Sequence, residues 1–569
     1  MTVPLDTDFK IVKDPVHTSI VLPSDFFKLI DDPLFQRLRY IKQTGLSHYV
    51  YPGLQHTRFE HSLGVAHLML TALDAIVRNT LRIYGEGSEA AQLAKRLVES
   101  REYRCAAGIA ALLHDLGHLA WSHVFETALQ DYEVVSSAHG PESLSIPVTG
   151  HEQLTTMLVN LLLAKQDTLC GLHAHTVLDL VTSILEYSYG DSKEVKDEAL
   201  WIPARLLSGT VDVDRGDYLL RDSRSAGVSY GLYDLDRLIS VLVLAWEPPT
   251  ELPGGAHSDV GVIDKGVSVV ENMLLGRMYM YSEVYLHDVV LAYEAGASRL
   301  LSTLMLAALQ LYERSFEGVE GFERRLLECI VDTLVNYSEL EENRPERLEQ
   351  CARLLTDPSI ELVTELLAFN ESSIYEGLKK LEDGRWACPA LRIYSRVLTA
   401  RKHPPSLYLS GKKANIIVSR MTRRSRRVSL PAIKRMLQPY FEALENTPLI
   451  IVTYTVYPVY SRDEPVLVVH RENKRVYTLH ELDTSPIGEL LSSGGIRSKV
   501  VVTFPPLPEL PELPHPAFRA RAGKLESKVV EHAYRACGYS DDETRNVLRQ
   551  ATRMVVDIAE EIGSLVTTL

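Results

Sequence analysis

Apolar residues recur at three- and four-residue steps through most of the first 310 or so residues, the spacing of helices with one buried face. The segments HSLGVAHLMLTALDAIVRNTL from His61, REYRCAAGIAALLHDLGH from Arg101 and HEQLTTMLVNLLLA from His151 show it clearly. The N-terminal FKIVKDPVHTSIVLP differs, because β-branched runs flank Asp14 and Pro15. That pattern predicts a short hairpin ahead of a helical region.

The same patterning predicts four regions. Residues 1–312 form a helical core, and 313–404 continue as charged helices such as RLLECIVDTLVNY. In 405–505, β-branched runs such as LIIVTYTVYPV, PVLVVH, KRVYTLHEL and KVVVTF follow a helix near PAIKRMLQPYFEAL, which predicts a small α+β domain. Residues 506–569 combine a proline-rich linker with two helices, near 522–536 and 541–566. We therefore expect a mainly α fold with a C-terminal α+β subdomain.

Composition narrows the class of protein. The 569 residues are 46% hydrophobic and 24% charged, as in soluble globular proteins, and the formal net charge of −15 disfavours non-specific nucleic-acid binding. No apolar run is long enough for a membrane span, and the N-terminus lacks a signal peptide pattern. The cysteines show no C-x-x-C pair, and we interpret them as buried thiols of a reducing compartment, the cytoplasm. They are Cys105, Cys170, Cys329, Cys351, Cys388 and Cys537.

One basic run, KKANIIVSRMTRRSRR at 412–427, departs from the acidic average. It could bind nucleotide phosphates, nucleic acid or an acidic neighbouring subunit. Without interleaved aromatic residues, nucleic acid is not the favoured partner, and a solvated basic loop or an oligomer contact remains the simpler interpretation.

Several histidines and an aspartate lie close together in the segment ALLHDLGHLAWSH, which is otherwise largely apolar. They are His114, Asp115, His118 and His123. On a helix, His114 and Asp115 point about 100° apart and can approach one ion from a shared edge. With His61 and an aspartate of VDVDRGDYLLRD, they would give two imidazoles and two carboxylates, a set suited to metal-assisted hydrolysis. The spacing alone leaves a metal site and a buried polar network as equal alternatives.

The motifs DPVHTSIVLP, DDPLFQRLRYIKQTG, HTRFEHSLGVAHL, LLHDLGHLAWSH, GHEQ and VDVDRGDYLLRDSRSAG resemble, in order, those of the HD-domain phosphohydrolases. The resemblance covers about residues 10–300 and is closest to the dNTP triphosphohydrolases, without the sterile-alpha-motif domain of the vertebrate enzyme. It implies that residues 1–312 form an HD-domain helical core. It also implies one divalent metal ion, Fe, Mn, Ni, Zn or Co, with Mg²⁺ as a candidate bridge to substrate phosphates.

The resemblance implies specific roles. The metal ligands would be His61, His114, Asp115 and Asp214, with Asp212 as the second choice. His123 would protonate the leaving oxygen, His118 and His151 would bind phosphate, and Glu126 and Glu152 would orient these imidazoles. Water would attack the α-phosphorus of a nucleoside triphosphate, releasing nucleoside and inorganic triphosphate. Substrate contacts would come from Gln43, Arg58, Arg215, Tyr218, Asp222, Arg277, Tyr281 and Tyr285.

The resemblance further implies a homo-oligomer, a dimer or tetramer, activated by a guanine nucleotide. Lys10, Asp31, Gln36 and Arg39 match residues of the allosteric nucleotide site, and ordinary helix-surface charge or packing is the alternative. Two positions depart from the family pattern. Thr44 replaces a bulky leucine beside the sugar, so the resemblance does not extend to discrimination against ribonucleotides. Tyr281 replaces a histidine near the triphosphate.

Two other functions stay open. One is an HD phosphohydrolase that acts on another phosphoester, such as a cyclic or signalling nucleotide or a nucleoside monophosphate. The other is a regulator that binds a nucleotide or nucleic acid without hydrolysing it. The set of His118, His123 and His151 favours a polyphosphate substrate and hydrolysis.

Overall fold

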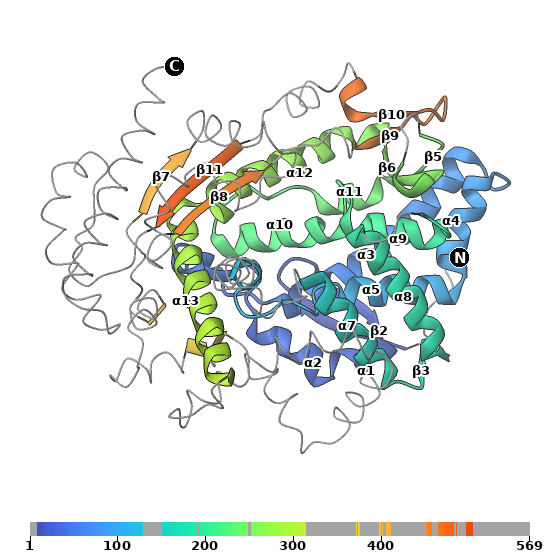
Figure 1. Ribbon diagram of the computed structural model, residues 1–569. Helices are drawn as coiled ribbons and strands as arrows, with labels where there is room; N and C mark the ends of the chain where they lie inside the picture. Colours follow the sequence, from blue (N-terminus) through green and yellow to red (C-terminus); the bar gives the residue numbers. More distant parts are fainter. Residues whose placement is uncertain are drawn as a thin grey trace, which may run out of the picture.

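The computed structural model describes residues 8–128, 151–190, 194–248, 252–313, 371–372, 374–375, 398–399, 401, 406–410, 451–457, 465–482, 485 and 497–503. Helices dominate this part of the chain, which confirms the predicted mainly α class (Figure 1). The α-helices are α1 (Phe27–Ile30), α2 (Pro33–Gln36), α3 (Arg58–Tyr84), α4 (Glu89–Glu99), α5 (Arg101–Leu113), α7 (His151–Ala164), α8 (Ala174–Tyr189), α9 (Glu198–Ser208), α10 (Val213–Ala226), α11 (Leu235–Ser240), α12 (Val267–Tyr279) and α13 (Asp288–Glu313).

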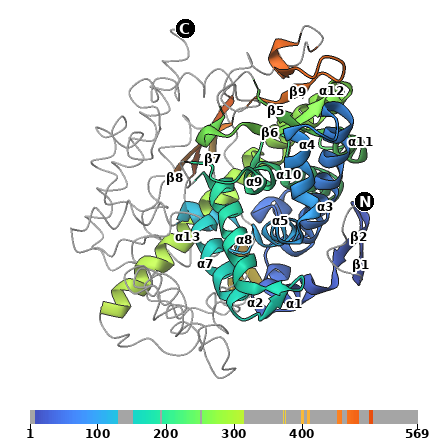
Figure 2. The ribbon, with the colours of Figure 1, turned by 90° about the vertical axis from the view of Figure 1, so that its right-hand side faces the viewer.

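Helix α3 is the centre of the core. It packs against α4, α5 and α10, and most of its residues are buried. Its start is fixed by a capping box, in which the side chain of Thr57 meets the backbone of Glu60 and the Glu60 carboxylate accepts from the Thr57 backbone N–H. The helix therefore holds Arg58 and His61 in its first turn. Helix α3 as a whole packs beside α10 (Figure 2).

The predicted N-terminal hairpin is confirmed. Strands β1 (Phe9–Asp14) and β2 (Thr18–Pro23) pair antiparallel, with Asp14 opposite Thr18. Asp14 Oδ1 accepts from the backbone N–H groups of Val16 (2.7 Å) and His17 (2.9 Å), so the aspartate shapes its own turn. The turn presents His17 to the core, since its imidazole bonds to α10.

Two further sheets join segments that are distant in sequence. The first sheet is four-stranded, in the order β10-β9-β6-β5, and its one parallel pair joins β6 to β9, with Gly261 opposite Leu467. The second sheet has three antiparallel strands in the order β7-β11-β8 and lies beside α13. A two-stranded hairpin pairs β3 with β4. The strands are β3 (Thr168–Leu169), β4 (Leu172–His173), β5 (Leu242–Trp246), β6 (Ser258–Ile263), β7 (Ser406–Ser410), β8 (Ile451–Tyr457), β9 (Leu467–Val469), β10 (Val476–Thr478) and β11 (Arg497–Thr503).

The four-region division stays a prediction, because much of 313–569 lies outside the described residues. The segments PVLVVH and KRVYTLHEL, assigned to the α+β region, contain β9 and β10 and extend the sheet of the helical core. The expected helices in 314–370, near PAIKRMLQPYFEAL and near 522–536 and 541–566 lie outside the described residues. So do the proline-rich linker and the basic run at 412–427.

The interpretation of all six cysteines as thiols is wrong for two of them. Cys105 on α5 and Cys170 in the β3–β4 turn form a disulfide, with Cα atoms 6.4 Å apart. The sequence could not indicate the pairing, because the two residues are 65 positions apart and meet only through the packing of α5 on α8. Among the helices that the structure describes, none is long and apolar enough to cross a membrane.

Candidate functional site

Two buried histidines turn one ring nitrogen each toward the same point. His61 Nδ1 lies 2.8 Å from Asp217 Oδ2, and His114 Nδ1 lies 2.8 Å from the carbonyl oxygen of Ala111. Both partners can only accept, so each Nδ1 carries a proton, and in the neutral form of each ring Nε2 has a lone pair. Neither Nε2 has a hydrogen-bond partner among the described residues, although both are buried. Such nitrogens fit the ligands of a metal ion.

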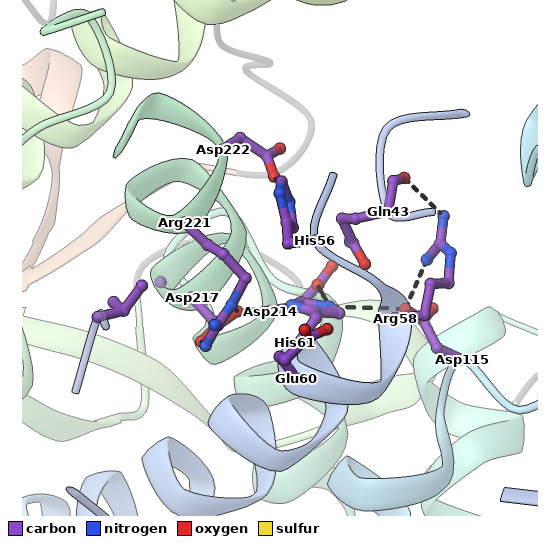
Figure 3. A network of polar contacts seen from close by, with 12 residues as sticks. Gln43, His56, Arg58, Glu60, His61, Asp115, Asp214, Asp217, Arg221 and Asp222 are labelled. Atoms are coloured by element: carbon purple, nitrogen blue, oxygen red, sulfur yellow. Dashed lines mark hydrogen bonds and ion pairs between the residues drawn. The ribbon is translucent and has the colours of Figure 1, made fainter. Parts of the chain in front are cut away.

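Two carboxylates complete this group (Figure 3). Asp214 Oδ1 lies 3.0 Å from His61 Nε2 and 3.7 Å from His114 Nε2. Asp115 Oδ2 lies 3.5 Å from His61 Nε2, and Asp115 Oδ1 lies 3.4 Å from His114 Nε2. The ligand atoms of His61, His114 and Asp115 all fall within 4.8 Å of one another. The four residues expected to be ligands are thus brought together, with a mixed nitrogen and oxygen set that a divalent transition metal accepts.

The electrostatics of this group favour a positive charge between the side chains. Burial lowers the pKa of His61, but the carboxylates of Asp214 and Asp217 outweigh burial and raise that pKa to about 10. Burial would raise the pKa of Asp115, yet Arg58 and His114 hold it well below its ordinary value. A bound divalent cation would meet the same demand for positive charge and would replace the extra proton on His61.

The expectation that one helix carries both His114 and Asp115 is corrected by the structure. Helix α5 ends at Leu113, His114 follows as its C-cap, and Asp115 lies in the next turn. The turn is held from outside, since the Gly117 N–H donates to Thr155 Oγ1 at 2.9 Å and Thr155 Oγ1 donates to the His114 carbonyl at 3.1 Å. Through Thr155, helix α7 therefore fixes the turn that positions His114 and Asp115 at the end of α5.

Behind His61 lies a network that the sequence reasoning missed. Asp217 accepts from His61, from His17 Nε2 at 2.6 Å, and from Arg221 at 2.8 Å through two guanidinium nitrogens. Arg221 also donates to Asp14 Oδ2 at 2.7 Å. Asp217 and Arg221 are four residues apart in VDVDRGDYLLRD, a spacing that indicates a pair on one helix face, but nothing in the sequence placed His17 or His61 beside them.

A second imidazole group lies next to the metal candidates. The rings of His118 and His151 stack with centroids 3.7 Å apart, and His118 Nε2 lies 3.4 Å from Asp115 Oδ1. Glu126 contacts three imidazoles: its oxygens lie 2.8 Å from His151 Nδ1, 3.1 Å from His123 Nδ1 and 3.6 Å from His118 Nδ1. His123 is the exposed member of the group, and burial followed by the charge of Arg58 lowers the pKa of His118 well below its ordinary value.

The contacts of Glu126 and Glu152 differ from each other. The Glu126 carboxylate is buried, but hydrogen bonds from His123 and His151 hold its pKa below the ordinary value. Glu152 Oε2 lies 3.7 Å from His151 Nδ1, on a side chain that is 43% exposed. Glu126 is therefore placed to orient the imidazoles, and Glu152 makes a longer contact with His151 alone.

A cavity of about 670 Å³ opens in front of both histidine groups. Its wall includes Arg58, Arg215, Tyr218, Tyr281 and Tyr285. Arg58 donates to Asp115 and to Ser122 Oγ, and Arg277 lies with its guanidinium carbon 5.4 Å from the Tyr281 ring centroid. The positive charges are thus beside the metal candidates, where they suit phosphate oxygens.

Asp212, the second choice for the metal ligand, has a structural role at the start of helix α10. It caps α10, accepting from the Arg215 N–H at 2.7 Å, and its other oxygen bonds to the Arg215 guanidinium. Burial raises the pKa of Asp212 to about 7, against the influence of Arg215. This arrangement directs Asp212 away from the histidines and leaves Asp214 to face them.

Asp222, expected to contact the substrate, has both carboxylate oxygens engaged in contacts within the chain. Asp222 Oδ1 lies 2.6 Å from His56 Nε2, and Asp222 Oδ2 accepts from the Tyr285 hydroxyl at 2.6 Å. Gln43, also on the cavity wall, has its side-chain oxygen without a partner among the described residues. His56 was missed by the sequence reasoning, although it begins the motif HTRFEHSLGVAHL.

The residues expected at an allosteric site lie outside the cavity wall. Lys10 Nζ sits 4.3 Å from the Phe27 ring centroid, and Gln36 Nε2 donates to the Ile30 carbonyl at 2.7 Å. Arg39 donates to Gln36 Oε1 at 2.7 Å and lies over the Phe59 ring. Asp31 is the C-cap of α1. These contacts within one chain agree with a packing role and leave the nucleotide role a prediction.

No family model matches the chain. An uncharacterized protein of Methanocaldococcus jannaschii is 30% identical over 282 residues, which are 49% of this chain and 47% of that protein. The deoxynucleoside triphosphate triphosphohydrolase SAMHD1 of Homo sapiens is 30% identical over 286 residues, 49% of this chain and 42% of the human protein. The chain thus spans about half the length of the curated relatives it matches.

A solved structure of a phosphohydrolase from Bacteroides thetaiotaomicron shares the fold. It has a TM-score of 0.57 and 23% identity, and the alignment covers 87% of this chain and all of that one. In this chain the motifs quoted above carry His61, His114, Asp115 and Asp214. Together these findings confirm the resemblance of the chain to the HD-domain phosphohydrolases.

Proposed function

We propose that this protein is a metal-dependent phosphohydrolase that cleaves deoxynucleoside triphosphates to nucleoside and inorganic triphosphate. The observation that carries the proposal is the pair of buried, unpartnered Nε2 atoms of His61 and His114, which face Asp115 and Asp214 at the wall of a large cavity. The name of the human relative supports the substrate class.

His61, His114, Asp115 and Asp214 would hold the metal. When bound, a divalent metal supplies Lewis acidity toward water and phosphate oxygens. The chain itself supplies the remaining functions. Arg58 and Arg215 offset the negative charge of the phosphates, and their planar guanidinium groups can hold two oxygens each.

His123 is the proposed general acid. Its Nδ1 is hydrogen-bonded to Glu126, which orients the ring and leaves Nε2 to give a proton to the leaving oxygen. His118 and His151 stack beside it and donate to phosphate. Tyr218 and Tyr285, whose ring centroids lie 6.2 Å apart, are placed to pack against the nucleoside.

Regulation is part of the proposal. We expect a homo-oligomer, and a guanine nucleotide near Lys10, Asp31, Gln36 and Arg39 that raises turnover. Lys13, also on β1, adds positive charge nearby, which suits a polyphosphate.

A product assay tests the activity. Purified protein is incubated with Mn²⁺ or Mg²⁺ and each dNTP and rNTP, with and without GTP, and products are resolved by ion exchange. Nucleoside and triphosphate are expected, with faster release in the GTP lanes if the activator site is correct. Release of single phosphate or diphosphate would reject the cleavage position. No turnover with metal bound would favour another phosphoester substrate or a sensor.

Two variants separate the roles within this assay. The double variant His114→Ala with Asp115→Ala should lose both metal and turnover while staying folded. His123→Ala should keep the metal and lower the rate by roughly 10²–10⁴-fold, as expected for a general acid. Loss of metal in the His123 variant, or undiminished turnover, would contradict its role.

A further inference from the structure

A buried carboxylate from the part of the chain that follows α13 contacts the turn that leads into His123. Glu371 Oε1 accepts from the backbone N–H of Lys42 at 2.9 Å and from the backbone N–H of Trp121 at 3.2 Å. Its other oxygen, Oε2, lies 3.6 Å from Lys42 Nζ. One side chain therefore joins two segments of the core that are distant in sequence.

The turn that Glu371 contacts has an unusual backbone. Trp121 and Ser122 have φ values of +60° and +53°, in the left-handed region that residues with a side chain adopt only at a cost. His123 follows directly, so the direction in which its imidazole leaves the chain depends on these two residues. Such a conformation persists only where the surrounding structure determines it.

Contacts from two side chains hold the turn, together with Glu371. Ser122 Oγ accepts from Arg58 Nε at 2.9 Å and donates to the Lys42 carbonyl oxygen at 3.1 Å. The Trp121 N–H donates to Glu371, and this hydrogen bond is buried. Loss of the carboxylate would leave that N–H without its acceptor, which costs more than the net value of an ordinary hydrogen bond. The turn would then relax away from its left-handed conformation.

The position of Glu371 is itself fixed by packing. Ile374 and Leu398, from the same part of the chain, are buried in the hydrophobic core. The Leu398 carbonyl oxygen accepts from the Tyr49 hydroxyl at 2.9 Å, and Arg401 Nη2 donates to the Tyr49 carbonyl oxygen at 2.7 Å. These contacts dock the segment on the core without touching the turn, so Glu371 is presented to the turn by a rigid support.

We propose that Glu371 is a positioning residue for proton transfer, which holds the Trp121–Ser122 turn so that His123 stands at the leaving oxygen. This inference rests on the proposed hydrolysis, in which water attacks the α-phosphorus, the bond from phosphorus to the 5′-oxygen breaks, and His123 gives that oxygen a proton. Misplacement of a reacting group by about 1 Å lowers a rate by roughly 10²-fold. The part of the chain after residue 312 would thus take part in completing the site.

The experiment compares two substrates in the full-length protein loaded with Mn²⁺. One is the dNTP that the wild type hydrolyses fastest, and the other is its analogue with sulfur in place of the 5′-oxygen. A thiol is far more acidic than an alcohol, so the sulfur leaves as a thiolate and does not need the general acid. The values of kcat and KM are measured for the wild type and for Glu371→Leu, Glu371→Gln and His123→Ala.

We expect Glu371→Leu to lower kcat on the oxygen substrate by roughly 10–100-fold with little change in KM, because the general acid moves while the phosphate contacts remain. The sulfur substrate should be hydrolysed at a rate close to that of the wild type, as in His123→Ala. Glu371→Gln should lose at most about fivefold on the oxygen substrate, since its amide oxygen still accepts from the two backbone N–H groups.

Leu398→Ala is the matched control. It opens a cavity in the same docked segment and should lower the melting temperature, while the contacts of Glu371 stay in place. Its ratio of kcat between the oxygen and the sulfur substrate should equal that of the wild type. Metal content and melting temperature are measured for every variant. If Glu371→Leu does not fold, Glu371→Asp replaces it, because its carboxylate is one methylene shorter and should lower kcat on the oxygen substrate alone.

Two results would overturn the inference and leave the proposed function intact. One is an equal loss on both substrates in the Glu371 variant, as a purely structural role would give; the other is an unchanged kcat on the oxygen substrate. If His123→Ala loses equally on both substrates, the proposed general acid is wrong and this inference is wrong with it. If the wild-type protein binds metal and hydrolyses no dNTP, the proposed function itself fails, and the inference fails with it.

Discussion

At the scale of single residues, the orientation of His61 depends on Asp217. The Asp217 carboxylate holds the Nδ1 proton of His61, and His17 and Arg221 hold the carboxylate in turn. Burial would raise the pKa of Asp217, but Arg221 and the two histidines hold it well below its ordinary value. The aspartate therefore stays ionised and keeps Nε2 of His61 free for a metal.

Replacing Asp217 by Asn should weaken metal binding by about 10–100-fold, because the amide can donate to His61 and no longer fixes its tautomer. The dissociation constant is measured by competition with a chelating dye. Asp236→Asn, at an exposed aspartate of α11, should leave it unchanged. Metal affinity equal to wild type in a folded Asp217→Asn protein would show that the network has only a structural role.

The sequence predicted which residues lie together best where those residues belong to the quoted motifs. His61, His114, Asp115 and Asp214 were expected together and do lie together. Their supporting partners were not predicted, since His17 and Asp217 are 200 positions apart and no local pattern connects them. His56 was missed for the same reason, because its partner Asp222 is 166 positions away in the sequence.

At the scale of elements, α3 and α10 approach each other closely at Gly64. A Cβ at this position would lie 2.0 Å from Asp217 Oδ1 and 2.9 Å from Arg221 Nη2. Both are fixed groups of the buried network, so neither can move aside without breaking a hydrogen bond. The absence of a side chain at Gly64 lets the turn of α3 that carries His61 sit against α10.

Gly64→Ala should therefore lower the free energy of unfolding by about 1–3 kcal/mol or more, as overpacking does, and should weaken metal binding. Gly216→Ala, on α10, is the control, because its Cβ would meet the nearest atom at 3.4 Å. It should be neutral or stabilise by up to about 1 kcal/mol through helix propensity. Urea denaturation measures both, and equal stability of the two variants would contradict the close packing.

Helix positions were largely predictable from the sequence, and strand partners were not. The recurrence of apolar residues at three- and four-residue steps predicted α3, α5 and α7, and the β-branched runs predicted the β1–β2 hairpin. The end of α5 was placed too late, because the residues that stop the helix at Leu113 pack against it from α7. The parallel pairing of β6 with β9 joins distant strands, and alternation within a strand carries no information about its neighbour.

At the scale of the whole molecule, the Cys105–Cys170 disulfide ties α5 to the β3–β4 turn. The helix that it restrains leads directly into His114 and Asp115. A cross-link over 65 residues limits the unfolded chain and stabilises the fold by about 2–4 kcal/mol. Such bonds persist in secreted proteins and within the cells of hyperthermophiles, so a disulfide is compatible with more than one compartment.

Refolding the protein in a reducing agent should lower its melting temperature by several degrees, since about 1 kcal/mol corresponds to roughly 2–4 °C in a domain of this size. Alkylation and mass spectrometry confirm the state of the two cysteines. The double variant Cys105→Ala with Cys170→Ala should melt at the same temperature with and without reductant. Free thiols at both positions in the protein purified without reductant would contradict the bond.

The spread of the metal candidates along the chain has a consequence for synthesis on the ribosome. His61, His114 and Asp115 leave the exit tunnel well before Asp214 and Asp217, by several seconds at about 5–20 residues per second. A nascent chain therefore exposes three of the four proposed metal ligands while the remaining carboxylate, Asp214, and the orienting partner of His61 are still to come. For the proposed metal site, we expect capture of the correct ion to be a late event, which follows the docking of α10 and depends on the ions that surround the finished chain.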